Sequence, residues 1–231
     1  MLSSSVSRIA LGFSVSVACM SAQAGITLKL DGWANPEPSY VTVAAADSTL
    51  NYVNGGAGPI AISLDGASFT TYCTDLRQDW PTGLDLSYSY VSGATAWGAQ
   101  KAGDLGRLVT YVGGLGQVDK ARGAAIQAAV WEILYENSGS YSFAGGDIQT
   151  FGTEGVLGAG PNPQAALDAI DWKEVMATNS IYRIDQLYSG TYQDFMVAAP
   201  VPEPSTYALL LGGLGLVGFV ARRHQAKADK A

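Results

Sequence analysis

Two apolar stretches, one near each end of the 231-residue chain, leave one central segment to fold into a globular domain. The first covers residues 9–20 and the second residues 207–220. Both are shorter than the roughly 20 apolar residues that a membrane-spanning helix needs. The segment between them, residues 25–200, has the length of one domain and is long enough to bury a core.

The N-terminal stretch has the features of an export signal. Arg8 precedes the apolar run, and Ala22 and Ala24 are the small residues that a signal peptidase reads. We therefore expect residues 1–24 to be a signal peptide, cleaved after Ala24. A lipoprotein site at Cys19 is the alternative, but Ser16 occupies the position where such a site has Leu.

The C-terminal stretch belongs to an ordered series of features. Residues 201–231 contain, in this order, Pro202, Glu203, Pro204, the apolar run 207–220, and the pair Arg222 and Arg223. This order resembles the PEP-CTERM sorting signal of Gram-negative bacteria. The resemblance implies transient anchoring in the inner membrane, cleavage near the triplet by an exosortase (a membrane protease-transpeptidase), and a secreted or cell-surface protein. The alternative is an ordinary C-terminal membrane anchor.

The composition of the domain excludes several kinds of chemistry. Residues 25–200 carry eight Lys and Arg against 18 Asp and Glu, a formal net charge of −10, which argues against nucleic acid as a partner. The chain's one histidine, His224, lies in the tail, so the domain has no Ser-His-Asp or Cys-His site, and we expect no metal and no cofactor. Cys73 is the domain's one cysteine, so an intrachain disulfide is impossible there.

Hydrophobic periodicity predicts an α+β fold in which a sheet is built from both ends of the domain around a helical insert. The predicted strands are 26–30, 40–43, 60–64, 68–76, 88–91, 181–187 and 192–197. A helix is predicted to end at Gly113-Gly114, a second to begin after Asp119, and a third to follow Asn162-Pro163. Residues 138–160 are predicted to be a glycine-rich loop, and 55–59 a turn.

Two short segments carry the candidate chemistry. Cys73 follows Tyr72 on a predicted strand, and Gln127 lies beside the apolar stripe of a predicted helix, four residues before Trp131. These segments resemble the two signatures of the thioester domain of bacterial surface adhesins. The resemblance implies a thioester-domain-like fold for residues 25–200, with an internal bond between the Cys73 sulfur and the Gln127 acyl group. Such a bond attaches the protein to an amine or hydroxyl of a surface protein or an extracellular polysaccharide.

Such a bond needs thiolate character at the cysteine, donors for the oxyanion, and shelter from bulk water. We expect Tyr72, Trp131 and Trp97 to line a narrow cleft around it. Asp75 either orients a donor there or serves as a turn carboxylate. An unreacted core cysteine, with Gln127 bonded only to backbone, is the simpler alternative.

Three functional hypotheses follow. The first is covalent attachment without turnover, and the second is a non-covalent structural or carbohydrate-binding matrix protein. Aromatic residues that could stack on sugars are Trp33, Tyr40, Tyr52, Trp80, Tyr88 and Tyr90. The third is a carboxylate-based hydrolase that uses two of Asp65, Asp75, Asp79 and Asp85. We favour attachment, because nothing in the sequence separates an acid from a base among these aspartates.

Overall fold

The computed structural model describes residues 25–35, 38–45, 53–64, 66–116, 118–153, 162–201 and 209–217. The predicted cleavage site at Ala22 and Ala24, the triplet Pro202, Glu203 and Pro204, and the pair Arg222 and Arg223 lie outside these residues. Within them the fold is mixed α+β, as the sequence predicted.

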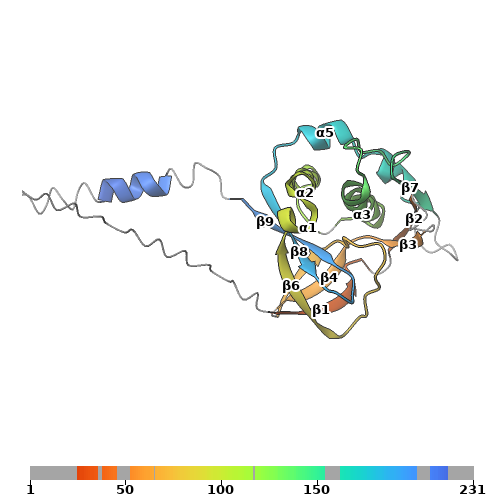
Figure 1. Ribbon diagram of the computed structural model, residues 1–231, viewed down its shortest axis with the longest axis horizontal. Coiled ribbons are helices and arrows are strands. Elements are labelled where there is room, and N and C mark those ends of the chain that lie inside the picture. Colours follow the sequence, from red (N-terminus) through yellow and green to blue (C-terminus); the bar gives the residue numbers. More distant parts are fainter. Residues whose placement is uncertain are drawn as a thin grey trace, which may run out of the picture.

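The described strands form two antiparallel sheets (Figure 1). The strands are β1 (Ile26–Trp33), β2 (Ser39–Ala45), β3 (Val53–Ala57), β4 (Ile60–Leu64), β5 (Ala67–Thr71), β6 (Asp85–Ser92), β7 (Ile148–Thr153), β8 (Tyr182–Tyr188) and β9 (Phe195–Pro200). The larger sheet has the order β5-β4-β1-β6-β8-β9, and the smaller has the order β3-β2-β7. The larger sheet therefore combines strands from both ends of the domain, as expected.

The larger sheet curls until its two edges meet. Residues 72–74, just after β5, pair with residues 194–196 at the start of β9, and we call this pairing the closure seam. Cys73 is paired antiparallel with Phe195 there through two backbone hydrogen bonds between the flanking residues, of 2.9 and 3.1 Å. The seam gives both edges hydrogen-bond partners that an open sheet would leave exposed.

Consecutive residues of the seam pack into different apolar clusters. Cys73 belongs to a cluster that includes Leu28 and Ile62, whereas Tyr72 belongs to a second one with Leu108 and Ile133 of the helices. Successive side chains of an extended segment point to opposite faces, which explains this division. The seam therefore lies between the two parts of the core.

Helices fill the insert between β6 and β8. They are α1 (Gly93–Trp97), α2 (Ala99–Val112), α3 (Lys120–Tyr135), α4 (Gln164–Asp168) and α5 (Trp172–Ala177). Gly113 ends α2 in the left-handed conformation (φ 85°), and the Asp119 carboxylate caps α3 by accepting from the Arg122 amide at 3.0 Å. Both boundaries confirm the sequence prediction.

Helix α3 runs through the interior of the domain. Every residue from 123 to 133 is buried, because α3 is in contact with α2 and α4 and with all three strands of the smaller sheet. Small residues allow this close packing; a Cβ at Gly123, for example, would lie 2.6 Å from Cδ of Pro59. Polar side chains on α3 therefore need partners within the protein.

The smaller sheet departs from the sequence prediction. β7 lies within residues 138–160, which were predicted to be a loop, and its Phe151 pairs with Thr42 of β2. β3 includes Gly55 and Gly56 of the predicted 55–59 turn. The predicted strand 68–76 ends at Thr71, and the region of the third helix holds the two short helices α4 and α5. Strand pairing outweighed the glycine content in these segments.

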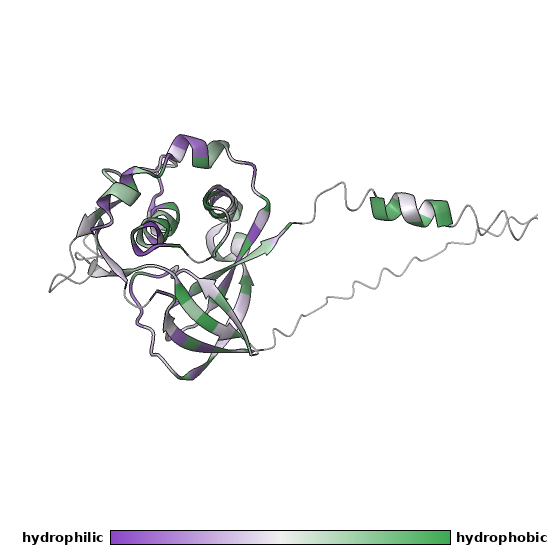
Figure 2. Cartoon of the chain, turned by 180° about the vertical axis from the view of Figure 1, so that it is seen from behind, coloured by the Kyte–Doolittle hydropathy of each residue, from purple (hydrophilic) through white to green (hydrophobic). Residues whose placement is uncertain are grey.

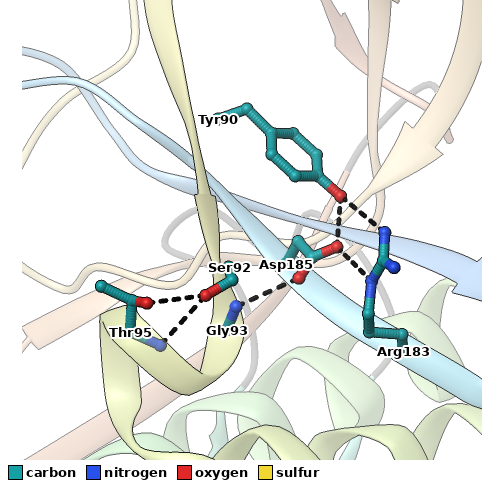
Figure 3. A network of polar contacts seen from close by, with 6 residues as sticks. All are labelled: Tyr90, Ser92, Gly93, Thr95, Arg183 and Asp185. Atoms are coloured by element: carbon teal, nitrogen blue, oxygen red, sulfur yellow. Dashed lines mark hydrogen bonds and ion pairs between the residues drawn. The ribbon is translucent and has the colours of Figure 1, made fainter. Parts of the chain in front are cut away.

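A buried carboxylate connects the start of the helical insert to the larger sheet (Figure 3). Asp185 of β8 is 2 % exposed and accepts from the Gly93 amide at 3.1 Å, from Arg183 Nε at 2.7 Å and from the Tyr90 hydroxyl. Burial alone would raise its pKa, but these hydrogen bonds hold the pKa of Asp185 below its usual range. Next to it, Ser92 caps α1 by accepting from the Thr95 amide.

The described part of the tail is helical over residues 209–217. Figure 2 shows this segment as largely apolar, and its leucines are exposed, with Leu209 at 77 % and Leu211 at 69 %. Among the described residues, no helix is both long and apolar enough to cross a membrane. The predicted membrane anchor over residues 207–220 is therefore not shown by the structure.

We expect Asp185→Asn to lower the free energy of unfolding at pH 7 by about 1–3 kcal/mol, because the change weakens three buried hydrogen bonds to a charged acceptor. Asp85→Asn is the matched control, since Asp85 is exposed at the start of β6, and should change stability by less than about 0.5 kcal/mol. Urea unfolding measures both variants. Equal midpoints for the two would contradict a structural role for the Asp185 network.

Candidate functional site

Gln127 of α3 and Cys73 of the closure seam are joined by two reciprocal hydrogen bonds. The Cys73 amide donates to Gln127 Oε1 at 2.9 Å, and Gln127 Nε2 donates to the Cys73 carbonyl oxygen at 2.8 Å. Gln127 is 1 % exposed and Cys73 is 6 % exposed with a free thiol. The carboxamide carbon, which is bonded to both of these Gln127 atoms, therefore lies beside the residue that carries the thiol.

A cavity of about 210 Å³ opens at this pair. Its apolar lining is formed by Trp33, Val41, Val43, Leu76, Trp80 and Trp131. Its polar lining is formed by Asp75, Gln78, Asp79 and Gln193, together with Cys73 and Gln127. Backbone at Gly56 completes one wall, where a Cβ would lie 2.9 Å from Cζ2 of Trp33. Strand β3 therefore needs a glycine at this position so that the indole can pack.

The loop after Cys73 is held against the other side of the seam by Gln193. The Gln193 side chain donates to the Asp75 carbonyl oxygen, and its backbone amide donates to the Asp79 carbonyl oxygen at 3.1 Å. The hydroxyl of Tyr135 accepts from the Leu76 amide at 3.1 Å. Two cavity-lining residues, Asp75 and Asp79, are thereby fixed through their main chain.

The Cys73 thiol lies in surroundings that oppose its ionisation. Burial, reinforced by the nearby Asp75 carboxylate, raises the pKa of Cys73 well above its ordinary value, although its own backbone amide opposes this shift. The thiol is therefore protonated at neutral pH. The expected thiolate character is absent, because burial disfavours the charged form more than the Cys73 backbone amide favours it.

Two acidic residues at the closure seam, Asp75 and Asp194, have different surroundings. The Asp75 carboxylate accepts from the Arg77 amide at 2.7 Å, which is the turn role considered from the sequence. Burial, with a further contribution from Asp75, raises the pKa of Asp194 to about 6, although its carboxylate accepts from the Ser189 amide. Asp194 therefore changes charge in mildly acidic solution, next to the seam.

The four cleft residues predicted from the sequence divide into two pairs. Trp131 and Asp75 line the cavity with Cys73 and Gln127. Tyr72 is fully buried and Trp97 packs against the same helical cluster, so neither is among the lining residues. Successive side chains of the seam point to opposite faces, so Tyr72 points away from the face that carries Cys73.

The residues of the hydrolase and sugar-binding hypotheses lie partly in the cavity and partly outside it. Asp75 and Asp79 of the hydrolase hypothesis line the cavity, whereas Asp85 does not. Among the possible sugar platforms, Trp33 and Trp80 line it, whereas Tyr88 lies in the core. No group of three or more His, Cys, Asp or Glu side chains in the described part of the chain is placed to hold a metal ion. Gln193 was not predicted as a site residue; it lies within the predicted strand 192–197, whereas β9 begins at Phe195.

Glu132 of α3 is a further buried acid with a raised pKa. It is fully buried, and burial raises its pKa to about 8 even though Oε1 accepts from the Ser142 amide at 2.7 Å. Its Oε2 has no partner among the described residues. Glu132 is not among the residues that line the cavity, and its contact with Ser142 indicates a structural role in holding the loop after α3.

The comparisons with known proteins concern the tail. Residues 200–223 match the PEP-CTERM protein-sorting motif. No curated protein and no solved structure matches the chain. The match therefore includes neither Cys73 nor Gln127.

The motif at residues 200–223 implies export and sorting to the cell surface, with an exosortase as the sorting partner. The chemistry that the domain performs after export has to be inferred from the cavity itself.

We expect Glu132→Gln to make the free energy of unfolding less sensitive to a rise in pH between about pH 4 and pH 8. An unfolded Glu ionises near pH 4.3, whereas folded Glu132 keeps its proton up to about pH 8, so the folded state binds the extra proton between these values. Raising the pH across this window destabilises the wild type by up to about 1.4 kcal/mol per pH unit through this group.

Urea unfolding at pH 5, 6, 7 and 8 measures this effect. The stability of Glu132→Gln should increase relative to the wild type at each step. Glu174→Gln, which changes an exposed residue of α5, is the control and should follow the wild type. Parallel curves for wild type and Glu132→Gln would show that Glu132 ionises normally in the folded protein.

Proposed function

We propose that the exported domain attaches covalently to amine or hydroxyl groups through an internal thioester between Cys73 Sγ and Gln127 Cδ. The observation that carries this proposal is the pair of reciprocal hydrogen bonds between the two residues. They hold an amide next to the domain's one cysteine, on two rigid elements of the core. Such fixed geometry replaces a bimolecular encounter and can contribute several kcal/mol to the rate.

The Cys73 amide has a second role in this proposal. It donates to Gln127 Oε1 at 2.9 Å, so it polarises the carbonyl and is placed to stabilise the oxyanion that forms when sulfur attacks. The donor belongs to the same residue as the nucleophile. Attack and charge stabilisation therefore depend on one fixed backbone position.

Formation of the bond is balanced without an outside reactant. The Cys73 sulfur attacks Gln127 Cδ, the C–N bond breaks, and the thiol proton leaves with the nitrogen as ammonia. The thiol is protonated in its buried site, whereas the thiolate is the nucleophilic form of cysteine. The proton therefore has to move from the sulfur to the leaving nitrogen as the sulfur attacks.

The thioester is then the reactive group on the mature protein. An incoming amine or hydroxyl attacks Gln127 Cδ, the C–S bond breaks, and the nucleophile's proton passes to sulfur. The domain becomes bonded through Gln127, and Cys73 returns to a thiol. Each molecule can undergo this acyl transfer only once, because the domain stays bonded to its target. The reaction is therefore attachment and not catalytic turnover.

Intact mass spectrometry of the exported protein tests the bond. The wild type should be lighter than its sequence mass by one ammonia, and reaction with an added small amine such as methylamine should leave it heavier than its sequence mass by one CH2. Cys73 should resist alkylation before methylamine and react after it, once the protein is unfolded.

Cys73→Ala and Gln127→Ala are the control variants for this experiment. Both should have their full sequence mass, with no response to methylamine. A wild type that also has its full mass, and whose Cys73 is alkylated stoichiometrically on unfolding without methylamine, would refute the proposal.

The sorting motif supports a second part of the proposal, the fate of the tail. We propose that residues 207–220 anchor the chain transiently in the inner membrane and that cleavage occurs close to the triplet at Pro202, Glu203 and Pro204. The folded domain ends immediately before this point, because the Val201 amide donates to the Ile181 carbonyl oxygen at 2.8 Å. The domain is therefore complete without the tail.

Peptide mapping of protein recovered outside the cell tests this cleavage. The C-terminal peptide should end near Pro202 and lack Arg222 and Arg223. Replacing Pro202, Glu203 and Pro204 together by alanine should leave the tail in place and the protein in the membrane fraction. Recovery of secreted wild-type protein that still contains the arginine pair would contradict the cleavage.

A further inference from the structure

One wall of the cavity at Cys73 and Gln127 is formed by a single loop. We call residues 75–80, which follow the closure seam, the entrance loop. Five of its residues line the cavity: Asp75, Leu76, Gln78, Asp79 and Trp80. Residues 74–84 contain neither helix nor strand, so no regular backbone pairing holds the loop. Its position therefore depends on individual contacts.

Gln193 bonds to both ends of the stretch from Asp75 to Asp79. Its side-chain Nε2 donates to the Asp75 carbonyl oxygen, and its backbone amide donates to the Asp79 carbonyl oxygen at 3.1 Å. Gln193 is 5 % exposed, and its own carbonyl oxygen accepts at 2.9 Å from the hydroxyl of Tyr88, a core residue. One residue thereby ties the entrance loop to the core of the larger sheet.

Gln78 adds a second link between the entrance loop and the same segment. With its amide nitrogen facing these acceptors, Gln78 donates to the Tyr192 carbonyl oxygen and, at 3.0 Å, to the Asp75 carboxylate. Gln78 is more exposed than Gln193, and a hydrogen bond close to water is weaker than a buried one. Two glutamines therefore hold the loop to the residues just before β9, and Gln193 contributes more of this attachment.

The position of this loop matters for the proposed acyl transfer because water competes with the target. A water oxygen would attack Gln127 Cδ, a C–O bond would form, the C–S bond would break, and one water proton would pass to the Cys73 sulfur. The side chain at position 127 would then be a carboxylate, which can no longer attach. Gln127 is 1 % and Cys73 6 % exposed, and the cavity that reaches them has the entrance loop as one wall. Opening of the loop therefore shortens the life of the thioester.

We propose that Gln193 is a positioning residue for this reaction: it holds the entrance loop closed over Cys73 and Gln127 and so limits how often water reaches them. It acts through the main chain of Asp75 and Asp79. The effect on the reaction rests on the proposed thioester, whereas the control of access does not. Access to the site then follows local opening of the loop and not global unfolding of the domain.

Access is measured first, by a method that works with or without the thioester. The exported protein is treated with methylamine, so that Cys73 is a thiol in either case, and the folded protein is then alkylated with iodoacetamide. Gln193→Met removes the side-chain donor and should raise the alkylation rate by about three- to tenfold. Gln193→His keeps an N–H donor and should restore a rate close to that of the wild type. Gln78→Met should raise the rate by about two- to threefold.

Two variants control for effects outside the entrance loop. Gln164 Oε1 accepts from the Gly152 amide at 2.8 Å, so Gln164 also fastens one segment to another, but it does not line the cavity. Gln164→Met should be alkylated at the wild-type rate. Asp185→Asn, which we expect to lower the free energy of unfolding, should keep that rate as well while the protein is folded, since Asp185 does not line the cavity. Equal acceleration in Asp185→Asn and Gln193→Met would show that alkylation follows global stability, and would overturn the proposal.

Hydrolysis is measured next, by intact mass of the untreated protein over time, because each hydrolysis adds one water to the ammonia-deficient form. The deficit should disappear about three- to tenfold faster in Gln193→Met than in the wild type. Circular dichroism checks the fold of each variant, and Gln78→Met tests the loop even if Gln193→Met does not fold. Wild-type alkylation and hydrolysis in the folded loop variants would overturn the role of Gln193 while the thioester stands. Faster alkylation of Gln193→Met, with no ammonia deficit in any protein, would overturn the thioester and support the control of access.

Discussion

The amide of Gln127, paired at both ends with the backbone of Cys73, is the interaction on which the rest of the site depends. It fixes a buried helix to the point where a curled sheet closes on itself. The residues on either side of Cys73 form the hydrogen bonds of the closure seam. The amide and carbonyl of Cys73 itself face the other way and bond to Gln127. The same two bonds therefore satisfy buried backbone groups of the fold and hold the Gln127 carboxamide against the backbone of Cys73.

Burial gives this site its particular chemistry. The surroundings that keep the Cys73 thiol neutral also slow hydrolysis of an acyl bond, because bulk water is kept from the core. The cavity then has to admit one chosen molecule, and the tryptophans and the fixed loop with Asp75 and Asp79 form its entrance. Cys73 and Gln127 are buried, and the same cavity that reaches them is lined by aromatic and polar side chains.

Much of the fold could be predicted from the sequence, because local signals agreed with the tertiary structure. The caps at Asp119 and Gly113 and the strands at both ends of the domain are examples. β7 was missed because its pairing with β2 is a long-range contact within a glycine-rich segment. At the site, the pairing of Cys73 with Gln127 was predicted because two segments resemble known motifs. Gln193 was missed because it bonds to the loop after Cys73 across the closure seam, and this contact between segments distant in sequence has no local signal.

The end of β9 bears on the proposed cleavage of the tail. The Val201 amide donates to the Ile181 carbonyl oxygen, and the matched sorting motif begins at residue 200, the last residue of β9. A protease that cuts beside a hydrogen-bonded strand needs a few residues of extended chain in its groove, so under the proposed cleavage the end of β9 has to open first. The free energy of opening this strand end would then set the rate at which the protein is released.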